Sequence, residues 1–319
     1  MKCIQDLEGH LKWVPSSPPP LEAGTLRIKV AATAVNRADL VQRAGHYPPP
    51  PGASDILGLE CAGTVAELGA EVTRFAVGDK VVALLAGGGY AEEVVVPEGQ
   101  VMPLPSGFSM VEGAAVPEVF ATAWLNLRLE GGLQPNERVL IHAAASGVGT
   151  TAVQLCAAWG NRVVGTMRSE EKFTRVTELG AELAVNTGEP GWMKRASANG
   201  KFDVILDPIG GRMLESNIYL LNPGGRMVNI GLMGGSEGTL PLGPLLTKRL
   251  TLKGSVLRSR SVQEKAEICA GLVQEVWPLL EAGRVRPIID SVVEITEAEL
   301  AHRKVASNKT VGKVVLRIP

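Results

Sequence analysis

The chain has 319 residues, 45% of them hydrophobic and 20% charged, and its formal net charge is −1. This length suits two domains better than one, and the composition is that of an ordinary globular protein. The nearly balanced charge excludes the strongly basic surface that binds nucleic acid or anionic membranes, so we expect neither as a partner.

The cysteines and the first residues both indicate a cytoplasmic protein. The four cysteines form no Cys-x-x-Cys pair, so neither a disulfide framework nor a zinc knuckle is expected, and reduced thiols are the simplest interpretation. The first twenty residues contain Asp6, Glu8 and three successive prolines where a signal peptide would have an apolar core. The cysteines are Cys3, Cys61, Cys156 and Cys269.

The first hundred residues have the pattern of β-strands. Leu26, Ile28 and Val30 alternate with polar neighbours, and the valine runs at 81–82 and 94–96 are bounded by Gly, Pro or Asp. Two proline-rich pieces, PSSPPP and YPPPPG, indicate rigid loops. A surface connection is favoured for both over a PxxP ligand.

From about Met110 the apolar residues recur with a helical period, and Pro117 is expected to bend that helix. Strand-like and helix-like segments then alternate, as in a doubly wound parallel sheet. One of the helices, Glu170–Leu179, is expected to end at Gly180. The strand candidates are Val139–His142, Val163–Thr166, Leu183–Val185, Asp203–Leu206, Met227–Ile230 and Leu250–Val256.

One apolar stretch, residues 139–164, is long enough to be compared with a membrane span. It contains Gly147, Gly149 and several polar residues, so a strand followed by a buried helix explains it better. Beyond Arg258 the pattern predicts a long helix to about Gly283, then a helix near 298–307 and a closing strand at 313–318. These last elements are expected to return to the N-terminal β-rich part.

The segment LIHAAASGVGTTAVQL, residues 140–155, joins a predicted strand to a predicted helix. A dinucleotide fingerprint requires Gly-x-Gly-x-x-Gly there, but this loop has Ala144 and Ser146 at the first two glycine positions and keeps Gly149 at the third. The N–H groups at a helix start face negative phosphates, and the Ser146 hydroxyl can donate to phosphate. A tight packing turn without a ligand is the alternative interpretation.

The end of the next strand bears on the choice between NADPH and NADH. NAD enzymes carry an Asp or Glu about twenty residues after the glycine loop, where it binds the ribose hydroxyls. Here GTMRSEEK places Arg168 at that point, with Lys172 one turn into a helix that Ser169 is expected to cap. Two cations suit a 2′-phosphate, so NADPH is favoured. A solvated helix start is the alternative, since Glu170 and Glu171 are neighbours.

Five segments together closely resemble one family: ASGVGTTAVQL, NRADLVQRAGHYPPPPGASDILGLECAGTVAELG, GLMGG, LRSR and NKTVGKVVL. The family is the NADPH:quinone oxidoreductases of the medium-chain dehydrogenase/reductase superfamily, in the branch near the zeta-crystallins and the tumour-suppressor-inducible quinone oxidoreductases. The resemblance runs from about residue 25 to the C-terminus. It implies an α/β protein with a GroES-like β-rich catalytic domain at residues 1–117 and 257–319 and a Rossmann doubly wound parallel-sheet domain at 118–256.

The same resemblance implies the site residues. Asn36 and Tyr47 are expected to border the nicotinamide and the substrate, and they are the catalytic candidates. The implied cofactor contacts are Thr122, Gly231, Leu232, Met233, Leu257, Asn308 and Thr310 near the nicotinamide, Ser146, Gly147 and Val148 at the pyrophosphate, and Ser169 and Lys172 at the adenosine phosphate.

The chain departs from the family at three points. Thr187 stands where relatives often have a tyrosine on the 2′-phosphate ribose, and Arg168 stands where glycine is common, so we infer that Arg168 supplies the missing contact. Zinc-containing relatives carry Cys and His ligands and a four-Cys lobe. Here residues 36–39 are Asn-Arg-Ala-Asp, residues 58–60 are Gly-Leu-Glu, and no such lobe exists, so we expect no metal.

The resemblance implies an NADPH-dependent quinone reductase that transfers hydride from the nicotinamide to a quinone without metal. The acceptor must lie within about 3–3.5 Å of the hydride donor. Tyr47 can donate a hydrogen bond to the quinone oxygen, although a rigid aromatic plug is an equal alternative. His142 is expected to be structural, because it lies on a buried strand.

Two alternative functions stay open, and a homodimer is expected. A 2-enoyl reductase, acting on an activated alkene, is possible on the same scaffold. A non-catalytic NADPH-binding redox sensor or structural protein is the other alternative. The segment LTLKGSVL is an apolar edge strand that pairing across a homodimer would cover.

Overall fold

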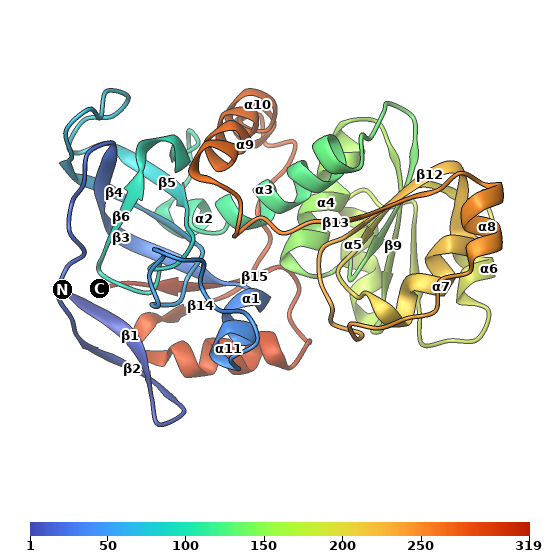
Figure 1. The fold of residues 1–319 in the computed structure, drawn as a ribbon, viewed down its shortest axis with the longest axis horizontal. Coiled ribbons are helices and arrows are strands. Elements are labelled where there is room, and N and C mark those ends of the chain that lie inside the picture. Colours follow the sequence, from blue (N-terminus) through green and yellow to red (C-terminus); the bar gives the residue numbers. More distant parts are fainter. The chain divides into compact units, whose positions relative to one another are not determined.

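In this computed structural model, which describes residues 1–319, the chain divides into two compact units (Figure 1). The first unit consists of Met1–Ala121, Leu257–Gly283 and Pro287–Pro319, and the second of Thr122–Val256 and Arg284–Arg286. No helix in either unit combines the length and the hydrophobicity that crossing a bilayer requires.

The first unit is rich in β-strands, as the alternation around Ile28 predicts. Its elements are β1 (Lys2–Leu7), β2 (His10–Pro15), β3 (Thr25–Val35), α1 (Arg37–Arg43), β4 (Glu60–Leu68), β5 (Lys80–Leu84), β6 (Glu93–Pro97), η1 (Glu98–Gln100), β7 (Val101–Pro103), α2 (Met110–Gly113), the start of α3 (Pro117–Trp124), α9 (Val262–Glu275), α10 (Trp277–Glu281), β14 (Ile289–Glu294), η4 (Ile295–Glu297), α11 (Ala298–Ala306) and β15 (Lys313–Arg317).

Seven of these strands form one sheet in the order β14-β15-β3-β4-β5-β7, with β6 also pairing with β3. All pairs except β14–β15 are antiparallel. β3 is the central strand, because different parts of it pair with β15, β4 and β6. Helix α11 packs on β15 and on β2 of the N-terminal hairpin (Figure 1). The C-terminal segment therefore completes the N-terminal sheet.

Prolines divide two helices that the sequence predicts as continuous. The helix from Met110 stops at Gly113, and Pro117 opens α3 instead of bending a single helix. The long helix after Arg258 stops at Glu275, and α10 starts with Pro278 in its first turn. Both expectations were wrong because proline lacks the N–H that a helix interior needs, whereas a first turn does not use it.

The second unit alternates strands and helices. Its elements are the end of α3, the π-helical turn η2 (Leu125–Glu130), β8 (Arg138–His142), α4 (Gly147–Ala158), β9 (Arg162–Met167), η3 (Glu170–Lys172), α5 (Phe173–Glu178), β10 (Leu183–Asn186), α6 (Trp192–Ala196), β11 (Phe202–Asp207), α7 (Gly211–Leu220), β12 (Leu221–Asn229), α8 (Leu242–Thr247) and β13 (Thr251–Gly254).

The six strands of the second unit form a parallel sheet in the order β10-β9-β8-β11-β12-β13. In chain order this is 3-2-1-4-5-6, the order of a dinucleotide-binding Rossmann sheet. The predicted doubly wound sheet is confirmed, and residues 139–164 form β8, α4 and the start of β9 instead of a membrane span. β12 begins at Leu221, well before the predicted Met227. Its first half was not predicted because it contains Pro-Gly-Gly, and these residues are uncommon in strands.

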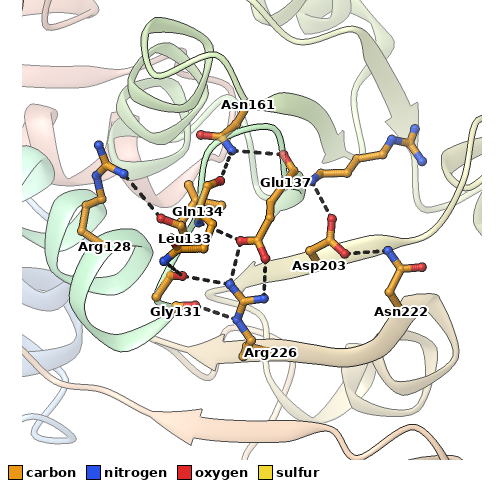
Figure 2. A network of polar contacts seen from close by, with 11 residues as sticks. Arg128, Gly131, Leu133, Gln134, Glu137, Asn161, Asp203, Asn222 and Arg226 are labelled. Atoms are coloured by element: carbon orange, nitrogen blue, oxygen red, sulfur yellow. Dashed lines mark hydrogen bonds and ion pairs between the residues drawn. The ribbon is translucent and has the colours of Figure 1, made fainter.

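A polar network holds the loop that leads into β8 (Figure 2). Arg226 of β12 donates to both carboxylate oxygens of Glu137, at 2.8 and 2.7 Å, and to the Gly131 carbonyl at 2.9 Å. The Asn161 amide donates to the Glu137 carbonyl at 3.1 Å. These contacts gather where β8 and β9 begin, whereas ligands of such sheets bind at the carboxyl ends. The network therefore stabilises the fold.

The predicted structural role of His142, the histidine of β8, is confirmed. His142 is 1% exposed. Its Nδ1 lies 2.6 Å from Thr166 Oγ1, and its Nε2 lies 2.7 Å from Asn217 Oδ1. Both ring nitrogens are thus satisfied inside the sheet, as a buried imidazole requires.

Candidate active site

The loop between β8 and α4 lies at the carboxyl edge of the parallel sheet, beside the point where the strand order reverses. Ser146 is the N-cap of α4, and its Oγ accepts from the Gly149 N–H at 3.0 Å. The hydroxyl proton stays available for donation. The N–H groups of Gly147 and Val148 belong to the first turn, which has no intrahelical acceptors for them. Together these donors fit a phosphate group.

Small residues set the backbone path of this loop. Ala144, at the first glycine position, avoids the left-handed region, and the positive φ of 50° falls on Ala143. A Cβ at Gly165 of β9 would lie 2.8 Å from the Ala144 Cβ, so that glycine makes room for the alanine. A Cβ at Gly149 would lie 2.3 Å from the Ala143 carbonyl oxygen. The loop therefore keeps the close helix–strand packing of the fingerprint with only one of its three glycine positions filled by glycine.

The predicted adenosine-phosphate residues follow β9 and β10. Arg168 is exposed directly after β9, Lys172 lies in η3, and the Thr187 N–H donates to the Met167 carbonyl at 2.9 Å. The expected Ser169 cap is wrong, because its side chain accepts no hydrogen bond from a helical N–H. The reason is that the chain first makes a 3₁₀ turn, and α5 begins only at Phe173.

Two exposed carboxyl groups, Glu170 and Glu189, follow β9 and β10. A hydrogen bond between Glu170 and Glu189 lowers the pKa of Glu170 and raises the pKa of Glu189. Glu189 also pairs with Arg195 at 2.7 Å. The surface after β9 thus carries charges of both signs. Any preference for a 2′-phosphate therefore depends on direct contacts of Arg168 and Lys172, because the surface has no general excess of positive charge.

The residues expected near the nicotinamide are divided between the units. Thr122 and the loop 231–233 belong to the second unit, where Leu232 is 58% and Met233 46% exposed after β12. Those two apolar side chains are available to contact a flat ring. Leu257, Asn308 and Thr310 belong to the first unit.

In the first unit, Leu257 is buried. Asn308 has a left-handed φ of 57°, and its Oδ1 accepts from Arg37 Nη2 at 2.6 Å. These contacts fix the turn between α11 and β15 on which Thr310 also lies. The cofactor roles of Leu257, Asn308 and Thr310 stay predictions.

The amide of Asn36, a predicted catalytic residue, is held within the first unit. Its Oδ1 accepts from Lys313 Nζ at 2.7 Å, and its Nδ2 donates to Glu60 Oε1 at 2.9 Å. Lys313 Nζ also donates to Glu60 Oε1, at 2.6 Å. Asn36 is only 8% exposed. Both polar atoms of its amide therefore have protein partners, and its catalytic role stays a prediction.

Two carboxyl groups with raised pKa values lie next to the cluster of Asn36, Glu60 and Lys313. The Glu118 N–H donates to Glu60 Oε2 at 2.9 Å, and burial together with the Glu60 charge raises the pKa of Glu118 to about 8. Burial raises the pKa of Asp39 to about 6, although its oxygens accept from the N–H groups of Asn36 and Gly58. At neutral pH Glu118 is mostly protonated and Asp39 mostly ionised.

The other predicted catalytic residue, Tyr47, is half-buried beneath an arginine. The guanidinium carbon of Arg258 lies 5.2 Å from the centre of the Tyr47 ring. Burial raises the pKa of the Tyr47 phenol, with a further contribution from Glu118. The phenol is therefore neutral around pH 7 and able to donate a hydrogen bond.

Four residues of this region were missed at the sequence level: Glu60, Glu118, Arg258 and Lys313. Three of them lie in the motifs that carry the family resemblance, so those motifs contained the signal: Glu60 in the segment 36–69, Arg258 in LRSR and Lys313 in NKTVGKVVL. Glu118 carries no such mark, and it joins the cluster only because α3 begins beside β4.

The residues present do not fit a catalytic zinc ion. No group of three or more His, Cys, Asp or Glu side chains in the structure is arranged to hold a metal. At the polar centre of the first unit, the Lys313 ammonium is already bound to the oxygens of Asn36 and Glu60. A second cation there would be repelled.

Two family models match the chain. Residues 22–106 match the alcohol dehydrogenase GroES-like domain, and residues 147–272 match the zinc-binding dehydrogenase domain. The first match lies in the first unit, and the second match begins at α4.

Curated relatives cover nearly the whole chain. Quinone oxidoreductase from Sus scrofa is 32% identical over 91% of this chain and 88% of its own length. The pikromycin polyketide synthase component PikAII from Streptomyces venezuelae is 34% identical over 95% of this chain. The chain spans 8% of that synthase, 5% of the polyketide synthase GfsB from Streptomyces halstedii and 65% of the VAT-1 homologue from Danio rerio.

Solved structures of two kinds share the fold. Quinone oxidoreductase from Thermus thermophilus, determined also in complex with NADPH, has a TM-score of 0.84 and 33% identity, covering 99% of this chain and all of that one. The CurK enoyl reductase also has a TM-score of 0.84, with 27% identity, covering all of this chain and 99% of that one.

Proposed function

Because the chain belongs to the medium-chain dehydrogenase/reductase superfamily, among the relatives of the quinone oxidoreductases, we propose that it is an NADPH-dependent quinone reductase that uses no metal. The supporting observation is the likeness to quinone oxidoreductases over nearly the full chain, one of them solved with NADPH. We further propose that the first unit is the catalytic domain and the second the NADPH-binding domain.

The α4 amino terminus supports the binding half of this proposal. Ser146, Gly147 and Val148 offer a hydroxyl and two N–H groups to the pyrophosphate, and Arg168 with Lys172 offers positive charge to the 2′-phosphate. When bound, NADPH supplies a hydride from its nicotinamide. Choosing NADPH over NADH depends on the two cations, because only the 2′-phosphate distinguishes the cofactors.

Tyr47 is the proposed hydrogen-bond donor to the quinone. Its phenol stays protonated, because burial raises its pKa. Asn36 is proposed to position the site, because its amide holds the start of α1 against Glu60 and Lys313 through hydrogen bonds. Two copies of the chain are proposed to pair through β13, an edge strand with Thr251, Lys253 and Gly254 exposed.

The test is NADPH oxidation with 1,4-benzoquinone and 1,2-naphthoquinone, before and after prolonged incubation with EDTA. We expect turnover with quinones that chelation leaves unchanged. A loss of rate that zinc restores would contradict the metal-free proposal. NADPH binding with reduction of no acceptor would favour a redox sensor or structural protein.

A 2-enoyl reductase is the second candidate, favoured by the polyketide synthase relatives and by the likeness to CurK. It adds hydride to an activated alkene and needs an acid near the α-carbon, for which Tyr47 is available. A crotonyl thioester offered beside the quinones separates the two activities. Faster reduction of the thioester would reverse our ranking.

A further inference from the structure

Arg258 is an arginine buried without a full set of partners. It is 3% exposed. Its Nε donates to the Ala86 carbonyl at 2.7 Å and its Nη1 to the Tyr47 carbonyl at 3.3 Å. Its Nη2 is buried and has no hydrogen-bond partner. Since buried charged groups are nearly always hydrogen-bonded, the open donor indicates a place for a ligand.

The surroundings of Arg258 fix the guanidinium without neutralising it. The two backbone carbonyls hold the group in place, and the Tyr47 ring lies 5.2 Å from its central carbon. No carboxylate forms an ion pair with it. The carboxyl groups that act on it electrostatically are those of Asp39 and Glu118, and Glu118 is mostly uncharged at neutral pH.

A second buried cation faces the same region from helix α9. Lys265 is 4% exposed, and its ammonium makes no hydrogen bond or ion pair within the chain. It interacts electrostatically with both Glu118 and Arg258. Burial lowers the pKa of Lys265 and of Arg258. The two positive charges repel each other, and a bound anion would relieve that repulsion.

We propose that Arg258 and Lys265 form an anion-binding site that holds the oxygen of the electron acceptor as it becomes negatively charged. This inference rests on the proposed quinone reduction and names the residues that recognise the acceptor. The ligand chemistry is an aryl oxygen anion beside the Tyr47 ring. The open Nη2 of Arg258 donates to that oxygen directly, and Lys265 adds a second positive charge.

The reaction balances with this assignment. One hydride, carrying two electrons and one hydrogen, converts a neutral quinone into a hydroquinone monoanion, while NADPH becomes NADP⁺. The negative charge resides on an aryl oxygen until a proton from water completes the hydroquinone. Fixed donors directed at that oxygen stabilise the charge where it develops.

Direct binding of 4-nitrophenol at pH 6 tests the site independently of turnover, because its phenolate is coloured and its phenol is not. A cationic site binds the phenolate and lowers the pKa of the bound molecule, so colour develops on titration with protein. The variants are R258K, R258M and K265M. The control is R317Q, which removes one positive charge at an exposed position of β15.

We expect wild type and R317Q to bind the phenolate alike, and R258M and K265M to weaken binding about tenfold or more. R258K should be intermediate, and it keeps the test valid if R258M fails to fold. Absence of phenolate binding by the wild type, or equal binding by all variants, would overturn the inference. Phenolate binding by a wild type that reduces no quinone would leave the site standing and remove the proposed reductase function.

Discussion

Lys313 and Glu60 form a fully buried ion pair, with the Nζ atom 2.6 Å from Oε1 and side chains 3% and 0% exposed. The two residues are 253 positions apart and lie on β15 and β4. Asn36 and the Glu118 N–H complete the hydrogen bonds of the carboxylate. The ion pair therefore links the last strand of the chain, β15, to β4 in the interior of the N-terminal sheet.

Removing one partner of this pair should strongly destabilise the first unit. K313M leaves the Glu60 carboxylate buried without its counter-ion, a change that costs about 3–5 kcal/mol. The matched control is R317Q on the same strand, which breaks an exposed pair with Glu294 and should cost about 0–1 kcal/mol. Urea unfolding of both variants measures the difference, and equal losses would contradict the role assigned to Lys313.

The raised pKa of Glu118 predicts a pH dependence of stability. Between its ordinary value of 4.5 and about 8 the folded state binds more protons than the unfolded state, so the free energy of unfolding should fall as pH rises through this range. Asp39 acts in the same direction but only below about pH 6. His302, whose pKa is lowered to about 4 chiefly by burial, acts in the opposite direction below 6.5. Burial also raises the pKa values of the thiols of Cys61, Cys156 and Cys269, which act in the same direction toward pH 8.5. The contribution of Glu118 is therefore the part of the pH dependence between 6.5 and 8.5 that a Glu118 variant removes.

The variant E118Q removes this titration. Its melting temperature should exceed that of the wild type at pH 8.5, by on the order of a few degrees, and the gap should narrow toward pH 6.5. E267Q, which changes an exposed carboxylate of α9, is the control and should follow the wild type at every pH. A constant gap across the interval would show that Glu118 titrates elsewhere.

Local pattern was sufficient for most elements and for the cofactor loop. Strand alternation and the βα repeat predicted the two kinds of sheet because those signals depend on neighbours in sequence. β14 escaped notice because its IDSVVE sequence is half-exposed and lacks clear alternation. The family motifs contain Asn36, Glu60 and Lys313, but the contacts among these residues were not predicted. Those contacts form across sequence separations of 24 and 253 residues, which no local pattern encodes.

Substituting Ser146 in two ways should separate its roles in binding and in helix capping. S146V removes the acceptor for the Gly149 N–H and puts methyl groups where phosphate is proposed to lie, so the NADPH Kd should rise more than tenfold. S146G restores the second fingerprint glycine and, as a tolerated N-cap residue, should change the Kd only a few-fold. Fluorescence titration with NADPH measures both, and unchanged binding by S146V would remove Ser146 from the site.

Cofactor preference should depend on Arg168. A charge-assisted hydrogen bond contributes about 1.5–3 kcal/mol, so R168A should weaken NADPH about tenfold to a hundredfold and leave NADH unaffected. R175A, which removes an exposed cation of α5, is the control. The measurement is kcat/KM for both cofactors, at low and high salt because exposed charges are screened. A wild type that prefers NADH, or an unchanged ratio in R168A, would refute the NADPH assignment.

The packing of Ala144 against Gly165 has a consequence for how such loops are recognised and altered. The volume saved by a fingerprint glycine is here saved by a glycine on the adjacent strand, so the two positions are interchangeable only as a pair. G165A alone should crowd the loop, because the new Cβ would meet both Ala144 and Val176, whereas A144G with G165A should recover the part of the loss that comes from Ala144. A nucleotide-binding turn is thus encoded by the combined size of facing residues. A search for the glycine fingerprint along one segment of the chain will overlook turns in which the glycine lies on the adjacent strand.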